Sequence, residues 1–151
     1  MQVDDKIRVL AHAFEDRAIL NRVAFLVRQI IEERTDQGRF INDNQKQYDP
    51  TYAKRRQARG LQTHAVNLEF SAAMFGSFDH NVNIKDLEIE LGFNRQEVAR
   101  LASYHDTYGA GRGKVVREFL GLTEPEQKEV ANYVLQEFGR KIDFTLNKNL
   151  P

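Results

Sequence analysis

The sequence predicts an α+β fold: a long N-terminal helix, a C-terminal helix and a small antiparallel sheet, with a mobile basic loop and a short helix between them. Two observations carry this prediction. Apolar residues recur at helical spacing near both ends of the chain, and they alternate with polar residues over 81–91. A chain of 151 residues has the length of one domain, so we expect a single domain over residues 1–151 with a core that needs no cross-links.

The predicted N-terminal helix runs from Asp4 to Glu33, where charged residues separate the apolar positions. The spacing slips near Asp16, so the pattern fits either one bent helix or two helices that meet there. The turn formers from Thr35 to Gly38 predict the helix end, because glycine adopts the left-handed C-terminal conformation at little cost.

The polar segment 39–48 predicts the mobile loop. Asp49 and Pro50 then predict the start of the short helix, since aspartate caps helix N-termini and proline is tolerated in the first turn. Gly60 predicts its end. Over 65–77 alternation and helical spacing both fit, and no element is assigned.

The alternating segment 81–91 predicts a hairpin of two half-buried strands around Lys85-Asp86. Its apolar positions are Val82 and Ile84 before the turn, and Leu87, Ile89 and Leu91 after it.

Three further elements follow the hairpin. A capping-box-like start at Asn94–Glu97 predicts a helix through His105. We expect a glycine-rich loop over 109–113 and a strand over 115–120. A second capping box over 123–126 predicts the C-terminal helix, which we expect to extend toward Phe144.

Most chemistry is excluded or unsupported by the residue types. The chain has no cysteine, which excludes disulfides, thiolate metal sites and thiol catalysis. The four histidines show no metal-ligand spacing, and no serine lies in a nucleophile elbow. The glycine-rich run ending at Lys114 lacks the Ser/Thr of a phosphate-binding loop and precedes a predicted strand. We therefore expect a non-enzymatic protein without cofactor or metal; a hydrolase would need a polar cleft around His105 or His64.

The N-terminal sequence lacks the layout of a signal peptide, and no apolar stretch approaches the ~20 residues that cross a bilayer. We therefore expect a soluble, non-secreted protein, with no membrane among its partners.

The charge balance of 22 basic and 22 acidic residues conceals local polarity. Segment 39–60 carries four more basic than acidic residues, segment 61–108 carries the reverse, and segment 109–122 has a basic excess of two. These basic segments predict contacts with an acidic protein partner or with phosphates; the competing interpretation is helix capping plus a solvated surface. The candidate interaction residues are Lys54, Arg55, Arg56, Arg59, Arg112, Lys114 and Arg117.

Six short motifs occur in a fixed order between residues ~30 and ~125. They are Glu33-Arg-Thr-Asp-Gln-Gly-Arg-Phe40, Tyr48-Asp-Pro-Thr-Tyr-Ala-Lys54, Arg59-Gly60, Val66-Asn-Leu68, Tyr104-His-Asp-Thr-Tyr-Gly109 and Arg117-Glu-Phe-Leu-Gly-Leu122. In order and spacing this set resembles the phage virion morphogenesis family, also called tail completion proteins. The chain departs from the family pattern at Asn67 (family Asp), at Ser71-Ala72 (family Thr-Gly) and at Glu118 (family Pro).

The resemblance implies a phage- or prophage-encoded structural protein that completes the tail or joins it to the head. It implies a long N-terminal helix packed on an antiparallel sheet, and homo-oligomeric rings between other virion proteins of the neck or tail. Proximity to DNA is a further candidate contact. The expected location is the virion, and the host bacterial cytoplasm during assembly. Arg117 and Phe119 are expected on alternate faces of their strand or across a bulge.

The segmental charges suggest how such a ring would form: the basic loop of one copy meets the acidic strand face of the next. The alternative function is a small nucleic-acid- or partner-binding module that uses the basic 39–60 segment.

Overall fold

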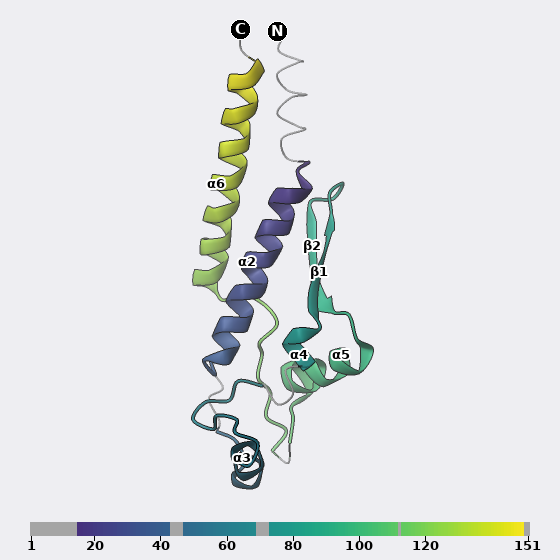
Figure 1. Ribbon diagram of the computed structural model, residues 1–151, viewed down its shortest axis with the longest axis vertical. Helices are drawn as coiled ribbons and strands as arrows, with labels where there is room; N and C mark the ends of the chain where they lie inside the picture. Colours follow the sequence, from purple (N-terminus) through teal and green to yellow (C-terminus); the bar gives the residue numbers. More distant parts are fainter. Residues whose placement is uncertain (1–14, 43–46, 69–72, 112, 150–151) are drawn as a thin grey trace. The chain divides into compact units, whose positions relative to one another are not determined.

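The computed structural model describes residues 15–42, 47–68, 73–111 and 113–149, and every structural statement below concerns these residues. Figure 1 shows the elements in chain order. They are α2 (Arg17–Asp36), α3 (Pro50–Gln57), α4 (Ala73–Gly76), β1 (Phe78–Asn83), β2 (Glu88–Phe93), α5 (Gln96–Ser103), the π-helical turn η1 (Tyr104–Tyr108) and α6 (Glu124–Asn149). The predicted α+β class, with helices in the N- and C-terminal regions and a two-stranded sheet, is confirmed.

The chain divides into two compact units, which we describe separately. Unit 1 comprises residues 1–27, 80–90 and 124–151, and unit 2 comprises residues 28–79 and 91–123. The single domain over 1–151 stays a prediction.

In unit 1 a helix starts at Arg17, where the sequence pattern slips. The Oδ1 atom of Asp16 accepts hydrogen bonds from the backbone N–H groups of Ala18 and Ile19, at 2.9 and 3.2 Å, and so caps the helix. Of the predicted Asp4–Glu33 helix, the part before residue 15 lies outside the described residues.

The core of unit 1 forms between α2, the hairpin and α6, and in Figure 1 this part of α2 lies between the other two. Its buried members are Ile19, Leu20, Val23, Val82 and Phe138, with partly buried side chains of all three elements packed around them. The apolar residues at helical spacing in α2 and the alternating apolar residue of β1 therefore face one shared core, as the sequence pattern predicts.

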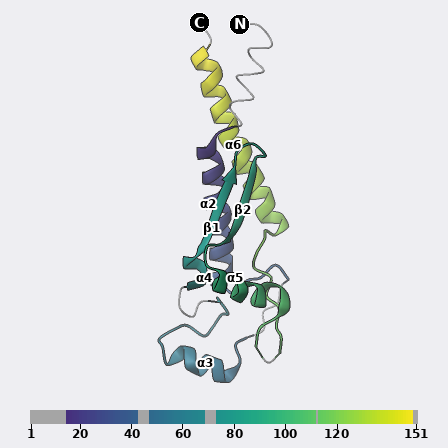
Figure 2. The same ribbon diagram turned by 90° about the vertical axis from the view of Figure 1, so that its right-hand side faces the viewer.

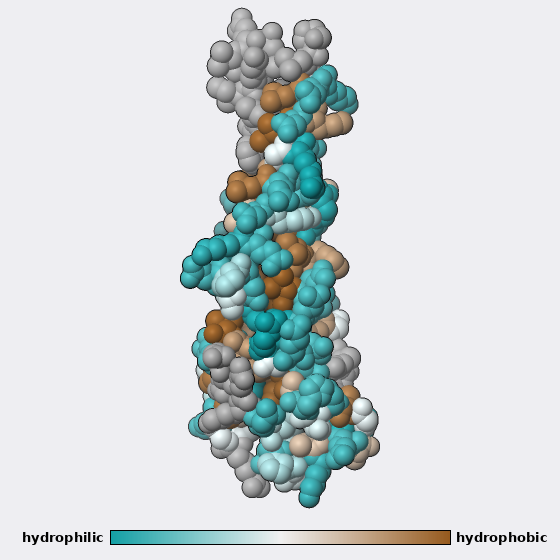
Figure 3. All heavy atoms as spheres, turned by 90° about the vertical axis from the view of Figure 1, so that its left-hand side faces the viewer, coloured by the Kyte–Doolittle hydropathy of each residue, from teal (hydrophilic) through white to brown (hydrophobic). Residues whose placement is uncertain are grey.

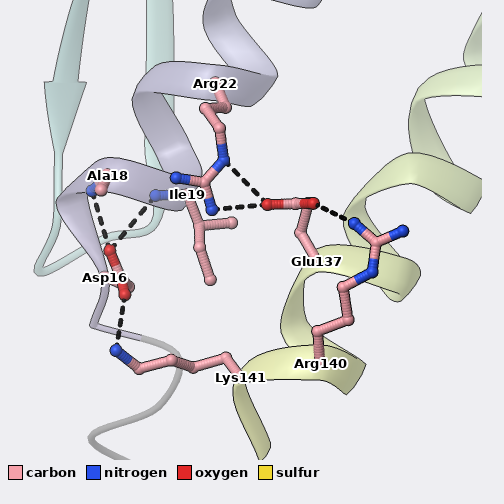
Figure 4. A network of polar contacts seen from close by, with 7 residues as sticks. All are labelled: Asp16, Ala18, Ile19, Arg22, Glu137, Arg140 and Lys141. Carbon is pink, nitrogen blue, oxygen red and sulfur yellow. Dashed lines mark hydrogen bonds and ion pairs between the residues drawn. The ribbon is translucent and has the colours of Figure 1, made fainter. Parts of the chain in front are cut away.

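A polar network joins α2 to α6 beside this core (Figure 4). The carboxylate of Glu137 accepts hydrogen bonds from Arg22 Nε at 2.8 Å and from Arg140 Nη1 at 2.9 Å. Lys141 Nζ lies 2.9 Å from Asp16 Oδ2, so Asp16 holds both the start of α2 and the side of α6.

The Asp16 pair gives a pH prediction. The hydrogen bond from Lys141 lowers the pKa of Asp16 below its ordinary value, so its stabilising contribution is present above the unfolded-state pKa and is lost as the pH falls through the lowered one. Replacing Asp16 with Asn retains a capping oxygen but not the charge, and is expected to cost less than about 1 kcal/mol at pH 7. Urea unfolding of both proteins between pH 7 and pH 2 should show this difference vanish in acid; a constant difference would contradict the ion pair.

The two strands form the predicted hairpin, with its turn at residues 84–87 (Figure 2). Asn83 Oδ1 accepts hydrogen bonds from the N–H groups of Lys85 and Asp86, which fixes the turn. The predicted strand position of Leu87 is wrong: it lies in the turn at φ +53° and is 49% exposed. The turn takes four residues instead of the two predicted, so the strand position predicted for Ile84 is wrong as well: Ile84 lies outside β1 and Leu87 outside β2.

In unit 2 the predicted start and end of the short helix are confirmed. Asp49 Oδ1 accepts from Thr51 N at 2.9 Å, and Gly60 adopts φ +71° just after α3. The predicted capping box at Asn94 is wrong: the N-cap position of α5 is Arg95, whose side chain makes no capping hydrogen bond.

The predicted strand over 115–120 is also wrong among the described residues, where Val115 forms one isolated bridge with Ala110. The segment instead hydrogen-bonds to side chains. Arg34 Nη2 donates to the carbonyls of Phe119 and Gly121, at 2.6 and 3.0 Å, and Asp106 Oδ1 accepts from the backbone N–H groups of residues 119 and 120.

Burial alternates along this segment even without a strand partner. Arg117 and Phe119 are buried whereas Glu118 and Leu120 are exposed. The expectation that Arg117 and Phe119 lie on alternate faces is therefore wrong, since two residues apart in extended chain place them on the same face.

In the described part of the chain, none of the helices combines the length and the hydropathy needed to cross a membrane. Figure 3 shows one face of the molecule, on which apolar groups reach the surface in separate patches among hydrophilic side chains.

Candidate interaction site

The predicted basic residues do not share one environment. Lys54, Arg55, Arg59 and Lys114 are exposed, Arg56 and Arg117 are buried, and Arg112 lies outside the described residues. The three consecutive basic residues in the last turn of α3, at positions 54–56, therefore divide between surface and interior.

Arg56 is 1% exposed and belongs to the interior of unit 2. Its Nε donates to the carbonyl of Gln62 and its Nη2 to Asn67 Oδ1, both at 3.0 Å. The guanidinium lies 4.6 Å from the ring centroid of Tyr48. These contacts hold three segments together, so Arg56 does not contribute to the predicted interaction surface.

Asn67 connects this group to the end of α2. Tyr48 Oη donates to Asn67 Oδ1 at 3.3 Å and accepts from its backbone N–H at 3.1 Å, while Asn67 Nδ2 donates to Asp36 Oδ1 at 3.2 Å. Burial raises the pKa of Tyr48, which keeps the phenol protonated as the donor.

A pocket of about 720 Å³ lies within unit 2, between α3, the end of α5 and the 110–117 segment. Two of the predicted interaction residues, Arg55 and Arg117, line it. His105, around which a hydrolase would need a polar cleft, lines it as well, and most of the other walls are aromatic or apolar. These walls include Tyr52, Val66, Leu68, Leu101 and Val115.

The pocket carries an excess of positive charge. Burial lowers the pKa of Arg117, yet an arginine remains a cation at neutral pH. Burial, and secondarily the charge of Arg117, lower the pKa of His105, which favours its neutral form. Among the described lining residues Asp49 is the single carboxylate, and its Oδ1 atom caps α3. The walls therefore suit an anionic group with apolar neighbours.

The same geometry does not assemble an oriented base. His105 Nδ1 is buried without a hydrogen-bond partner, and Oδ1 of the neighbouring Asp106 is committed to two backbone N–H groups. A general base is normally oriented by such a partner. Within the described ranges no group of three or more His, Asp or Glu side chains is arranged to hold a metal ion.

The first glycine of the glycine-rich loop, Gly109, is required by the backbone geometry of the turn. Gly109 adopts φ +82°, and a Cβ atom there would lie 2.2 Å from the carbonyl oxygen of Lys114. Any side chain would prevent the turn that pairs Ala110 with Val115, the bridge beside the pocket.

Comparison with known proteins adds no relative: no protein-family model, no curated protein and no solved structure matches the chain.

Proposed function

We propose that the chain is a structural virion-assembly protein of a phage or prophage, which completes the tail or joins it to the head through protein contacts in a ring. The observation that supports this proposal is that the motif residues bond to one another inside unit 2. Arg34 binds the carbonyls of Phe119 and Gly121, and Asp106 binds the N–H of the same Phe119.

Two of the three departures from the family pattern fit this framework, and the third, Ser71-Ala72, lies outside the described residues. Asn67 replaces the family's aspartate and lies against Asp36, where its amide donates a hydrogen bond that a second carboxylate lacks. Glu118 replaces a proline, and its carbonyl accepts from Ile41 N at 2.7 Å, a role that proline also fills. Proteins that share a fold need the same internal contacts, so motif residues that bond to one another inside the unit support the resemblance. Separately, the cationic pocket offers a surface for binding but no oriented base for catalysis.

The test is deletion of the coding sequence from the phage or prophage that carries it. Electron microscopy of lysates should show separate heads and tails and few joined particles, and the intact gene supplied in trans should restore them. An early stop codon in the supplied copy is the matched control. Joined, infectious particles in the deletion strain would overturn the proposal.

The exposure of Lys54, Arg55 and Arg59 at one end of α3 favours nucleic-acid binding as the second candidate. Phosphate contacts would make DNA retention on a filter fall steeply with salt, and reversing these three charges would flatten that dependence. If the unmodified protein shows no salt-sensitive retention of DNA, this second candidate fails.

A further inference from the structure

The tip of the hairpin, which we define as Asp86-Leu87-Glu88, exposes an apolar side chain between two acidic ones. Leu87 combines two unfavourable features, because it is 49% exposed and adopts the left-handed conformation at φ +53°. Leucine seldom adopts that conformation, and such outliers concentrate at functional positions. Asparagine or glycine would suit this backbone conformation better.

The turn presents this tip in a fixed form. The two hydrogen bonds that Asn83 Oδ1 accepts hold the backbone of Lys85 and Asp86, so Leu87 projects from an ordered turn. An ordered tip loses little conformational entropy on binding, which favours its use as an anchor.

The pocket of unit 2 has the complementary chemistry. Val66, Leu68 and Val115 supply apolar walls, and Arg55 and Arg117 supply cations. Leu101, near the end of α5, also lines the pocket, and the following turn η1 exposes two aromatic residues packed edge-on, Tyr104 and Tyr108, which are 57% and 68% exposed with ring centroids 6.3 Å apart. This contact surface exceeds what a small anion would cover and fits a protein segment.

We infer that the pocket receives the hairpin tip of a second copy of this chain. Leu87 enters between the apolar walls, and the carboxylates of Asp86 and Glu88 face Arg55 and Arg117. Charge complementarity selects this occupant: the tip is an exposed acidic and apolar segment, and the pocket is cationic and apolar. A contact between two different surfaces is head-to-tail, and it closes into a ring when the rotation between copies permits. The inference thus deepens the proposed function, for which it names the contact within the ring.

The experiment is sedimentation of the full-length chain over a concentration series at low and high salt. The unmodified protein should self-associate as its concentration rises, more weakly at high salt. Leu87→Asn, Arg55→Glu and Glu88→Lys should each weaken association at least tenfold, roughly the effect of losing an interface anchor. Asparagine tolerates the left-handed conformation, so Leu87→Asn should unfold at the same urea concentration as the unmodified protein or a higher one.

A double variant that exchanges the charges of the pocket and the tip tests directly whether these two residues meet. In the double variant Arg55→Glu, Glu88→Lys every pocket meets a tip of opposite charge at these positions, and association should recover toward that of the unmodified protein. The controls are Arg39→Glu, an equal charge change at an exposed residue outside the pocket lining, and Leu135→Gln, which removes an exposed leucine of α6. Both should associate normally.

Three outcomes would overturn the inference: a chain that stays monomeric at high concentration and low salt, association unaffected by the tip and pocket variants, or single variants that the charge exchange does not rescue. A tip bound in the pocket of its own chain would give the first outcome. Failure here leaves the proposed function standing if deletion of the gene still yields unjoined heads and tails.

Discussion

Replacing Arg56 with methionine is expected to lower the free energy of unfolding of unit 2 by about 2–4 kcal/mol. Methionine has similar length but donates no hydrogen bonds, so the carbonyl of Gln62 and Oδ1 of Asn67 lose donors in a buried site. The stacking of the guanidinium on Tyr48 is lost as well.

The measurement is urea unfolding followed by tyrosine fluorescence. The chain has no tryptophan, and four of its five tyrosines, at positions 48, 52, 104 and 108, belong to unit 2, so the signal reports mainly on that unit. Arg55→Met is the matched control, because it removes the same charge from the exposed neighbouring position and should change stability little. Arg56→Lys should fall between them, since it keeps the charge but not the planar donors. Equal stability of Arg56→Met and the unmodified chain would contradict the structural role.

The contrast between Arg55 and Arg56 shows where the sequence stops being informative. Both lie in the last turn of a capped helix, and composition and capping treat them alike. Adjacent helical residues point about 100° apart, so one faces solvent when the other faces the interior. Which of them is buried depends on Asn67, eleven residues away, whose position no local pattern records.

Local rules predicted elements that are held by local contacts. Asp49 with Pro50 and Gly60 marked the bounds of α3 because their hydrogen bonds and dihedral angles lie within a few residues. The apolar pattern likewise located α2, the hairpin and α6. The 115–120 strand failed for a different reason: its alternation of burial is real, but Arg34 and Asp106 supply the hydrogen bonds that a neighbouring strand would have supplied.

The pocket could not be read from the sequence, since its walls come from four separated segments around residues 47–55, 66–68, 101–105 and 110–117. Charge counting did find two of its members, Arg55 and Arg117, because an excess of cations in a segment persists whatever the fold. At the hairpin tip, the alternating pattern placed Leu87 in a strand because it assumed a turn of two residues, Lys85 and Asp86. The turn is longer and includes Leu87, which adopts a positive φ there.

The largest loss of stability is expected from Phe119→Ala, which should lower the free energy of unfolding of unit 2 by about 3–5 kcal/mol. Phe119 is 0% exposed, and its ring packs edge-on against Phe75 with centroids 6.0 Å apart. The backbone around it is fixed by Arg34 and Asp106, so the segment cannot shift readily to fill the cavity that alanine leaves.

The next residue provides the control. Leu120 is exposed on the opposite face of the same extended segment, so Leu120→Ala should cost less than about 1 kcal/mol under the same urea and fluorescence conditions. Because Arg117 lies two residues before Phe119 on the buried face, the alanine variant should also weaken self-association, whereas the Leu120 variant should preserve it. Similar losses of stability from the two substitutions would mean that the segment is not held face-inward, and the position assigned to Arg117 in the pocket wall would fail with it.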